Sequence, residues 1–425
     1  MTNDFKTYIL IGAGLILIIF FMIFAGILPG IKPSSPPAVS LEFWGVEDDN
    51  AVWRDLIDGL KQDYPYISVT YRRFDRESYE STLINRLAEG TGPDVFFLKN
   101  SWVQEDKDKI LPLPAKLFDY TARDFRNEFV DVASADMITD SGAILGFPLF
   151  VDTLALFYNK DIFNSSGVAS PPTTWDELLL VSDKVTKRDE KGMVTRGGLA
   201  LGNARNTENY FEIISILILQ NGDSIVGSDG RSIVLEEKAK DAVEFYRTFA
   251  NIVSPNFSGN LGSKSSLDAL ADGSVAMAIG FSQDLKRVRA KNPHISLGIA
   301  PLPQVASSPA KNYGSYYFPV VSKLSKNPKA AWDFLFYMSS RGTAKKYLEL
   351  TSRPASRRDL IQAGSPTDDL DVFYRQSLSA KSWPVPDEAS TMRIFRDMIE
   401  SSGFNETSVN QAVNRAREQL RLLLP

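Results

Sequence analysis

The chain has 425 residues, of which 44% are hydrophobic and 23% charged, and its formal net charge is −5. This length allows two large lobes, and the composition is that of a globular protein. Basic and acidic residues are interspersed and form no basic face, so no nucleic-acid partner is expected. The sequence has no cysteine and a single histidine, His294. These counts exclude disulfides and thiolate or multi-histidine metal sites, and they leave almost no material for Ser-His-Asp catalysis; we expect neither a metal nor a cofactor.

An uncharged segment, residues 7–31, lies between Lys6 and Lys32 near the N-terminus. Its apolar centre, residues 8–28, would span about 30 Å as a helix, which is the thickness of the hydrocarbon core of a membrane. The apolar part of a cleaved signal peptide is only about 7–15 residues long. We therefore expect a retained transmembrane anchor over residues 7–31, with the body outside the cytoplasm.

The segments on either side of the expected anchor are short. Residues 1–6 form a cytoplasmic stub, and residues 32–39 form a proline-rich, extended linker. Ala38, Val39 and Ser40 resemble a small-residue cleavage site. A removed signal peptide is therefore the alternative to a retained anchor.

The body begins with two strand–helix units and a third strand. Strands are predicted at residues 41–45, 67–71 and 95–98 from short apolar or alternating runs. Helices are predicted at residues 53–64 and 79–87 from apolar residues spaced three and four apart. This order predicts a parallel sheet with right-handed crossovers, whose ligands bind beyond the carboxyl ends of the strands.

The central stretch of the chain has three parts. Residues 144–150 are apolar and include a proline, which favours an edge or crossing strand. Residues 154–158 are typical of a buried strand. Thr174 and Glu177 are spaced for a capping box, in which each side chain accepts a hydrogen bond from the other residue's backbone amide. A helix from Thr174 to about residue 187 is therefore predicted.

Three motifs of the body point to one family. The first is a Tyr-Asn-Lys-Asp strand end that begins at Tyr158, followed by a glycine and by Pro-Pro-x-Thr-Trp-Asp-Glu from Pro171. The others are Gly-Pro-Asp at residues 92–94 and Gly-x-x-Ala-Met at residues 273–277. Together these motifs resemble the sugar-type extracellular solute-binding proteins of ABC importers, and the resemblance covers residues 41–359.

The resemblance implies an α/β, two-lobed fold of the periplasmic-binding-protein (type II) kind, with a cleft between the lobes. The Gly-x-x-Ala-Met strand is then expected to return the chain to the first lobe. The first lobe is expected to comprise residues 40–149 plus 281–313, and the second lobe residues 150–280 plus 314–425.

The resemblance also implies which residues line the cleft, by their positions after strands, at helix starts and near the crossings between lobes. Structural alternatives exist: packing under the helices for Trp44, the start of a helix for Trp102, capping for Asn206, and a plain hinge for Gly314. The expected ligand-binding residues are Trp44, Asn100, Ser101, Trp102, Asp152, Asn203, Asn206, Tyr210, Phe281, Gly314, Ser315, Tyr316 and Trp383.

The expected function is that of a monomeric, membrane-attached solute-binding protein and not of an enzyme. It would capture a carbohydrate or a related small polar solute by hinge closure and deliver it to an ABC-type permease. The cysteine that carries the lipid anchor in the family is missing, so a helix would replace that anchor.

Two other functions stay open from the sequence. The same cleft could belong to a ligand-sensing ectodomain coupled to a membrane receptor. An anchored glycosidase with paired carboxylates is the second alternative, although no motif places two carboxylates in acid and base roles. Peptide, polyol and phosphorylated ligands also remain open.

Overall fold

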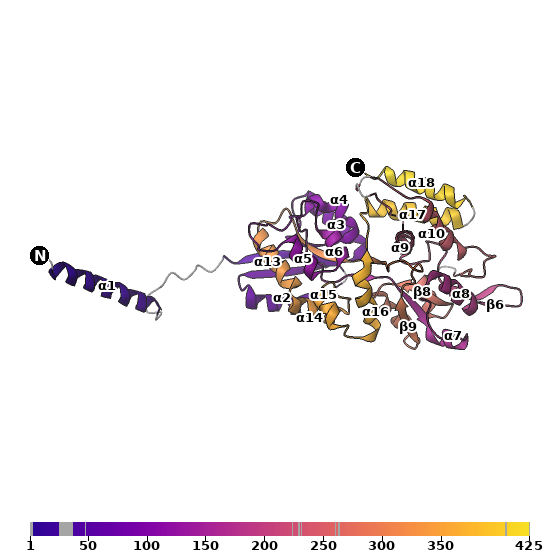
Figure 1. Ribbon diagram of the computed structural model, residues 1–425, viewed down its shortest axis with the longest axis horizontal. Helices are drawn as coiled ribbons and strands as arrows, with labels where there is room; N and C mark the ends of the chain where they lie inside the picture. The colour runs from indigo at the N-terminus through magenta and orange to yellow at the C-terminus, as the bar shows by residue number, and fades with distance from the viewer. Residues whose placement is uncertain are drawn as a thin grey trace.

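The protein has two α/β lobes preceded by a separate N-terminal helix. Figure 1 shows α2, α3, α13 and α14 gathered in one lobe and α7, α8, α10 and α18 in the other, with α16 between them. The computed structural model describes residues 3–24, 37–46, 48–222, 224–227, 230, 232–259, 261, 264–403 and 406–424.

The N-terminal helix α1 (Asn3–Phe24) exposes large apolar side chains, among them Phe5, Leu15 and Phe20. Within the described ranges, no helix combines the length and apolar character needed to cross a membrane. The fold therefore gives no support to the expected transmembrane helix at residues 7–31. Residues 25–31 of the expected transmembrane helix, and most of the expected linker, lie outside the described part of the chain.

The first lobe is built on a four-stranded sheet of order β11-β3-β1-β2. As the β-α-β-α-β pattern predicts, β1 runs parallel to β2 and β3, while β11 is antiparallel to β3. Trp53, Leu56 and Leu60 form the buried stripe of α2. The elements are β1 (Val39–Val46), α2 (Asn50–Asp63), β2 (Ile67–Phe74), α3 (Arg76–Ala88), β3 (Val95–Lys99), η1 (Asn100–Trp102), α4 (Val103–Asp106), η2 (Lys107–Lys109), α5 (Ala122–Glu128), α6 (Asp131–Met137), β11 (Tyr317–Val321), α13 (Pro328–Ser339), α14 (Arg341–Thr351) and α15 (Arg358–Ala363).

The second lobe is built on a five-stranded sheet of order β6-β7-β8-β5-β9. β8 lies at its centre, and all six of its residues are buried. The elements are β5 (Ala155–Asn159), α7 (Lys160–Ser165), α8 (Trp175–Val185), β6 (Lys187–Arg188), β7 (Val194–Leu199), α9 (Tyr210–Gln220), α10 (Glu237–Thr248), α11 (Ser266–Ala271), β8 (Val275–Gly280), α12 (Asp284–Lys291), β9 (Leu297–Pro301), α17 (Glu388–Gly403) and α18 (Val409–Arg421).

A small third sheet of order β12-β10-β4 joins the lobes. β4 (Asp152–Thr153) leads into β5 of the second lobe, and β10 (Asn312–Ser315) leads back into β11 of the first lobe. Helix α16 (Asp368–Gln376) and η3 (Ser377–Ser379) precede β12 (Ala380–Lys381), which leads into α17. Because each of these strands is a crossing between lobes, we call this sheet the hinge sheet.

The structure corrects the expected division of the chain in two places. β9 pairs with β5, so residues 281–313 belong mainly to the second lobe. β11 pairs with β3, so residues 317–363 belong to the first lobe. β8 lies between β7 and β5 and does not return the chain to the first lobe. A short apolar strand fits either sheet equally well, and long-range packing decides its partner.

The start of α8 also differs from the expected capping box. The hydroxyl of Thr174 accepts a hydrogen bond from the backbone N–H of Glu177 at 3.2 Å, as predicted. The Glu177 carboxylate, however, accepts from the backbone N–H of Thr173 at 2.7 Å instead of from Thr174. Half of the predicted box is therefore present, and the second bond is shifted by one residue.

Gly198 of β7 is required by the close approach of α8. A methyl group on Gly198 would lie 2.3 Å from Oγ and 2.4 Å from the carbonyl oxygen of Ser182. Because the backbone of α8 would have to move, Gly198→Ala is expected to lower the free energy of unfolding by about 1–3 kcal/mol. Urea unfolding measures this change.

The control for this prediction is Gly342→Ala in α14, where a methyl group would meet no atom within 4 Å. It should change the free energy of unfolding by less than about 0.5 kcal/mol. Equal effects of the two substitutions would contradict the packing of α8 on β7.

Candidate functional site

A narrow cavity lies between the lobes beside the hinge sheet. Its volume is about 50 Å³, far below the roughly 300–1,000 Å³ of small-molecule pockets. The first lobe contributes Arg76, Lys99, Phe150, Tyr317 and Arg353, the hinge region contributes Asp152, Ser315 and Tyr316, and the second lobe contributes Asn209, Glu212, Phe281 and Gln283.

A larger groove of about 600 Å³ adjoins this cavity. It lies between α2 and α14 of the first lobe and α12 and α16 on the opposite side, and it shares Arg76, Gln283 and Arg353 with the cavity. The cavity and the groove therefore lie side by side, and we call the two together the interlobe cleft. Its combined size is that of a small-molecule site.

The charges of the cavity are sorted by lobe. The cations of Arg76, Lys99 and Arg353 come from the first lobe, whereas the carboxylates of Asp152 and Glu212 come from the hinge and the second lobe. Opposite charges on the two walls attract, so this arrangement favours approach of the lobes. A solute between the walls would meet hydrogen-bond donors on one side and acceptors on the other.

Glu212 is the buried carboxylate of the second-lobe wall. It lies in the first turn of α9, is 8% exposed, and lines the cavity. Burial raises the pKa of Glu212, and the positive charge of Lys99 opposes this rise. A carboxylate in this position is a strong acceptor for the hydroxyl groups of a solute.

Asn209 turns the chain into α9 and places the helix start at the cavity. Its φ of 59° lies in the left-handed region, which asparagine tolerates better than most residues. The side-chain amide of Asn209 donates to Asp284 Oδ2 at 3.2 Å. This contact ties the start of α9 to the start of α12, and both helices contribute to the second-lobe wall.

Arg353 forms the buried cationic end of the first-lobe wall. Its guanidinium pairs with Asp48 at 3.2 Å and lies 4.2 Å from the ring centre of Phe150. Burial acts to lower the pKa of Arg353, but the neighbouring Tyr347 and Asp48 outweigh burial and raise it. Arg353 therefore stays charged at the junction of the cavity and the groove.

Asp152 presents a carboxylate from the hinge strand β4. Ser282 donates to it through its hydroxyl at 2.7 Å and through its backbone N–H at 3.1 Å. Burial raises the pKa of Asp152 to about 6, although the hydrogen bonds from Ser282 oppose that rise. These contacts attach the segment after β8 to the first crossing of the hinge.

A polar cluster holds the other two crossings. The Asn100 amide donates to the Gly314 carbonyl at 3.2 Å and to Asp136 Oδ2 at 3.1 Å, and Asn100 Oδ1 accepts from the backbone N–H of Tyr316 at 3.2 Å. The hydroxyls of Tyr316 and Ser382 also donate to Asp136. Asp136 thus links α6 of the first lobe to the segments that follow β10 and β12.

The structure brings four of the expected ligand-binding residues into the lining of the cavity. These are Asp152, Phe281, Ser315 and Tyr316. Asn100 and Gly314 lie just behind them in the polar cluster of the hinge. Contact of these residues with a solute stays a prediction.

Two other expected residues are buried just after Lys99 and contact Glu388 of α17. The Ser101 hydroxyl donates to Glu388 Oε1 at 2.6 Å, and the Trp102 indole donates to Oε2 at 2.7 Å. Trp102 ends the turn η1 and is the N-cap residue of α4, so the structural alternative given for it, the start of a helix, is confirmed.

The remaining expected residues have structural contacts. Trp44 is buried against Phe74, and Trp383 is buried in the second lobe with its indole donating to Ser215. Neither tryptophan is part of the described cavity lining. Trp44 lies within β1 and not after it, so its ring packs in the first-lobe core. The backbone carbonyl of Asn203 accepts a hydrogen bond from the Tyr246 hydroxyl, and that of Asn206 accepts one from the backbone N–H of Ser266. The Tyr210 hydroxyl donates to the backbone carbonyl of Met392.

Several lining residues were not predicted, although most lie next to predicted ones. Lys99 directly precedes Asn100, and Glu212 lies two positions after Tyr210. The strand-end rule points to the right loops, but it does not decide which side chain of a loop faces the cleft. Arg353 begins a stretch that resembles a Pro-Ala-Arg turn of the family, but the sequence does not show that this side chain reaches the cavity, because its place depends on long-range packing after α14.

Two α/β lobes, a strand-built hinge and a cleft lined from both sides define a binding protein whose lobes close around a small ligand. The family model described as bacterial extracellular solute-binding protein matches residues 44–345. This match covers more than half of the chain, and the protein belongs to that family, which is made of binding proteins. Solute binding outside the cytoplasm is the role of this family.

Similar proteins include several sugar-binding proteins. Maltodextrin-binding protein MdxE of Bacillus subtilis is 24% identical over 306 residues, which is 67% of this chain and 69% of the relative. The sugar-binding protein MalE of Xanthomonas citri has the same fold, with a TM-score of 0.77 at 20% identity over 91% of this chain and 97% of that chain. An ABC transporter solute-binding protein of Thermotoga lettingae, bound with α-D-tagatose, has a TM-score of 0.71 at 22% identity over 91% of this chain and 100% of that chain.

The polar cluster at the hinge makes stability depend on pH. Burial raises the pKa of Asp136 to about 6, against the lowering effect of its three hydrogen bonds. An unfolded aspartate has a pKa of about 4, so between these values the folded state binds more protons than the unfolded state. The contribution of Asp136 to the free energy of unfolding therefore falls as the pH rises from about 4 to about 6.

The variant Asp136→Asn cannot titrate and should lack this part of the pH dependence. Urea unfolding of both proteins between pH 4 and pH 7 measures the difference. The other buried carboxyls titrate in both proteins and cancel in the subtraction. Parallel pH profiles would contradict the role assigned to Asp136.

Proposed function

We propose that the protein captures a carbohydrate or a related small polar solute in the interlobe cleft. The observation that carries this proposal is the lining of the cleft, where the carboxylates of Asp152 and Glu212 lie beside the rings of Phe281 and Tyr317. Carboxylates accept hydrogen bonds from hydroxyl groups, and aromatic rings pack against apolar C–H faces. Relatives that bind maltodextrin and tagatose support carbohydrate as the solute class.

Capture would proceed by closure of the lobes about the hinge sheet. Side-chain contacts already cross the cleft, among them a hydrogen bond from Arg76 to Gln283 at 3.4 Å and one from Lys286 to the carbonyl of Thr351 at 3.2 Å. A solute that contacts both walls binds the closed form more tightly than the open form and shifts the population toward it. The small cavity volume agrees with lobes that are close together.

Delivery requires a partner that distinguishes closed from open lobes. We propose an ABC-type permease as this partner, in keeping with the transport role of the family. The protein would act as a monomer, because one chain supplies both walls of the cleft.

Attachment of the body to the outer side of the membrane is also a proposal, and it rests on the uncharged segment at residues 7–31. The full-length protein is expected to stay with the membrane fraction after an alkaline carbonate wash and to keep its N-terminal residues. Release by the wash, or an N-terminus that begins near residue 39 in the mature protein, would contradict attachment by this segment.

The solute class is tested by a thermal-shift screen of the protein against mono- and oligosaccharides, polyols, amino acids and peptides. Binding to the folded state stabilises it by about 2.7 kcal/mol when the ligand is at a hundredfold excess over its Kd. We expect a saturable rise in Tm with one class of sugar. A rise with amino acids or peptides alone would contradict carbohydrate as the solute.

The site is tested with Glu212→Gln, measured by calorimetry with the sugar that raises Tm. Loss of a charged acceptor from a hydrogen bond costs about 1.5–3 kcal/mol, so Kd should rise about tenfold or more. Glu237→Gln on α10 is the control, because the side chain of Glu237 is 80% exposed on the outer face of the same lobe. Equal Kd values for Glu212→Gln and the unmodified protein would contradict the site.

A further inference from the structure

Glu388, the first residue of α17, reaches from the second lobe to the first. Its carboxylate accepts hydrogen bonds from Lys99 Nζ at 2.6 Å, from the Ser101 hydroxyl at 2.6 Å and from the Trp102 indole at 2.7 Å. Lys99 is the last residue of β3, and Ser101 and Trp102 lie in the turn η1 that follows it. One carboxylate of the second lobe is thus surrounded by donors of the first lobe.

The segment that carries Glu388 is held to both lobes. Its hinge strand β12 pairs with β10. The Ser382 hydroxyl then donates to Asp136 of the first lobe, and the Trp383 ring packs 6.0 Å from that of Phe211 in the second lobe. Asp387 accepts from the backbone N–H of Ser390 at 2.7 Å and so caps α17. Glu388 therefore projects from an ordered helix start and not from a loose loop.

The contact between Glu388 and Lys99 is shielded from water. The two side chains are 11% and 17% exposed. Burial acts to raise the pKa of Glu388, but Lys99 and the hydrogen bonds from Ser101 and Trp102 outweigh it and lower that pKa. Both groups are therefore charged in the closed form, where little water competes with their contact, and opening the lobes would replace that contact with hydration of both groups.

Three acidic neighbours, Glu80, Glu105 and Glu212, lie close enough to feel the charge of Glu388, and they oppose this pair. Glu80 lies on α3 of the first lobe, and its pKa is raised to about 7, first by burial and then by the charge of Glu388. At neutral pH a large part of Glu80 is therefore protonated, which limits its repulsion of Glu388. Against these carboxyls stand the charge of Lys99 and the hydrogen bonds from Ser101 and Trp102, and the pKa of Glu388 is lowered on balance.

We infer that Glu388 is an interlobe latch, which holds the lobes closed through Lys99, Ser101 and Trp102 independently of any solute. It is a positioning residue, since it acts through the distance between the lobes. It also neutralises Lys99, which lines the cavity, and so leaves Glu212 as the acceptor for a solute. A solute that binds only the closed form has an apparent affinity proportional to the fraction of molecules that are closed. Because the latch raises that fraction, it also raises the apparent affinity for the solute.

The inference is tested on the ligand-free full chain and does not depend on the identity of the solute. The chain has no cysteine, so thiol-reactive spin labels attach only to the two cysteines that are introduced. Lys61→Cys on α2 and Lys238→Cys on α10 place one exposed label on each lobe. Double electron–electron resonance then reports the distance between the lobes.

Glu388→Gln keeps the shape of the side chain but removes its charge. We expect the ratio of closed to open molecules to fall about tenfold, seen as a shift of the distance distribution to longer values. Lys99→Met removes the cation but leaves Ser101 and Trp102 as donors, and it should shift the distribution in the same direction by less. An unchanged distribution in both variants would overturn the inference.

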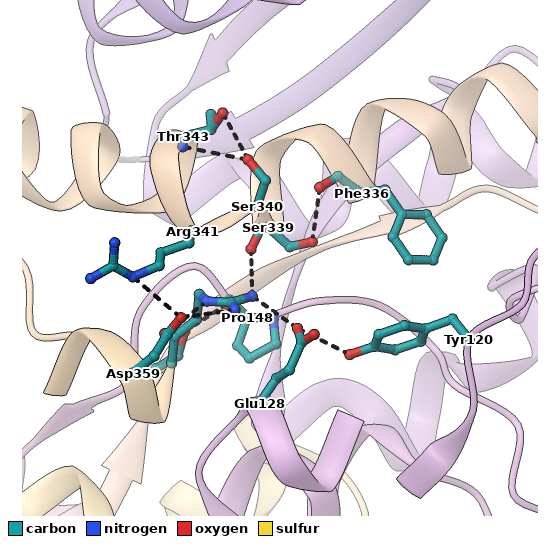
Figure 2. Close-up of polar contacts among 11 residues, drawn as sticks. Tyr120, Glu128, Pro148, Phe336, Ser339, Ser340, Arg341, Thr343 and Asp359 are labelled. Carbon is teal, nitrogen blue, oxygen red and sulfur yellow. Dashed lines mark hydrogen bonds and ion pairs between the residues drawn. The ribbon is translucent and has the colours of Figure 1, made fainter. Parts of the chain in front are cut away.

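The matched control is Glu128→Gln, which removes the same charge within one lobe. Figure 2 shows Glu128 beside Tyr120 and Asp359, and its carboxylate pairs with Arg357 at 2.9 Å. All four residues belong to the first lobe, so this variant should lower Tm without changing the interlobe distance. An equal shift in Glu128→Gln would show general loosening of the protein and would also overturn the latch.

Discussion

The hinge sheet is the constraint on which the rest of the structure depends. The pairing of Gly314 with Thr153 and of Asn312 with Ala380 brings three segments that are far apart in the sequence to one place. Each segment continues into a lobe, so the position of this sheet decides where the lobes meet. The side chains beside it, such as Asp152, then become the walls of the cleft. Rotation about these short strands changes the distance between the walls while the cores of the lobes stay intact.

The separation of charge between the lobes follows from this arrangement. Lys99 and Arg353 lie on the first-lobe side and face Glu212 and Glu388 on the second-lobe side. Water would weaken such attractions in an open cleft, whereas closure removes water and strengthens them. The same charges that can bind a polar solute therefore also stabilise the closed form. Binding and closure share one set of side chains, and this is how a small solute can change the shape of a large protein.

The sequence predicts local structure well where periodicity is strong. Helix α2 ends within one residue of its predicted end, and β3 extends the predicted strand at residues 95–98 by one residue, because apolar residues mark both elements clearly. Strand partners could not be predicted, because β9 and β11 are equally short and apolar, and long-range packing assigns one to each lobe. For the cleft, the sequence indicated which loops contribute to it but not which side chains face it. Ser315 and Asp152 were found from their positions at crossings, whereas Glu388 is distant in sequence from Lys99 and gives no local pattern.

The central claim is that the solute binds between the lobes and contacts both. Hydrogen–deuterium exchange of the protein, with and without the sugar that raises its Tm most, tests this claim directly. We predict slower exchange in the segments 99–102 and 314–317 near the first lobe and hinge, and at the same time in the segments 209–212 and 281–284 of the second lobe. Protection confined to one lobe or to the outer surface, or no protection by any sugar, would contradict it.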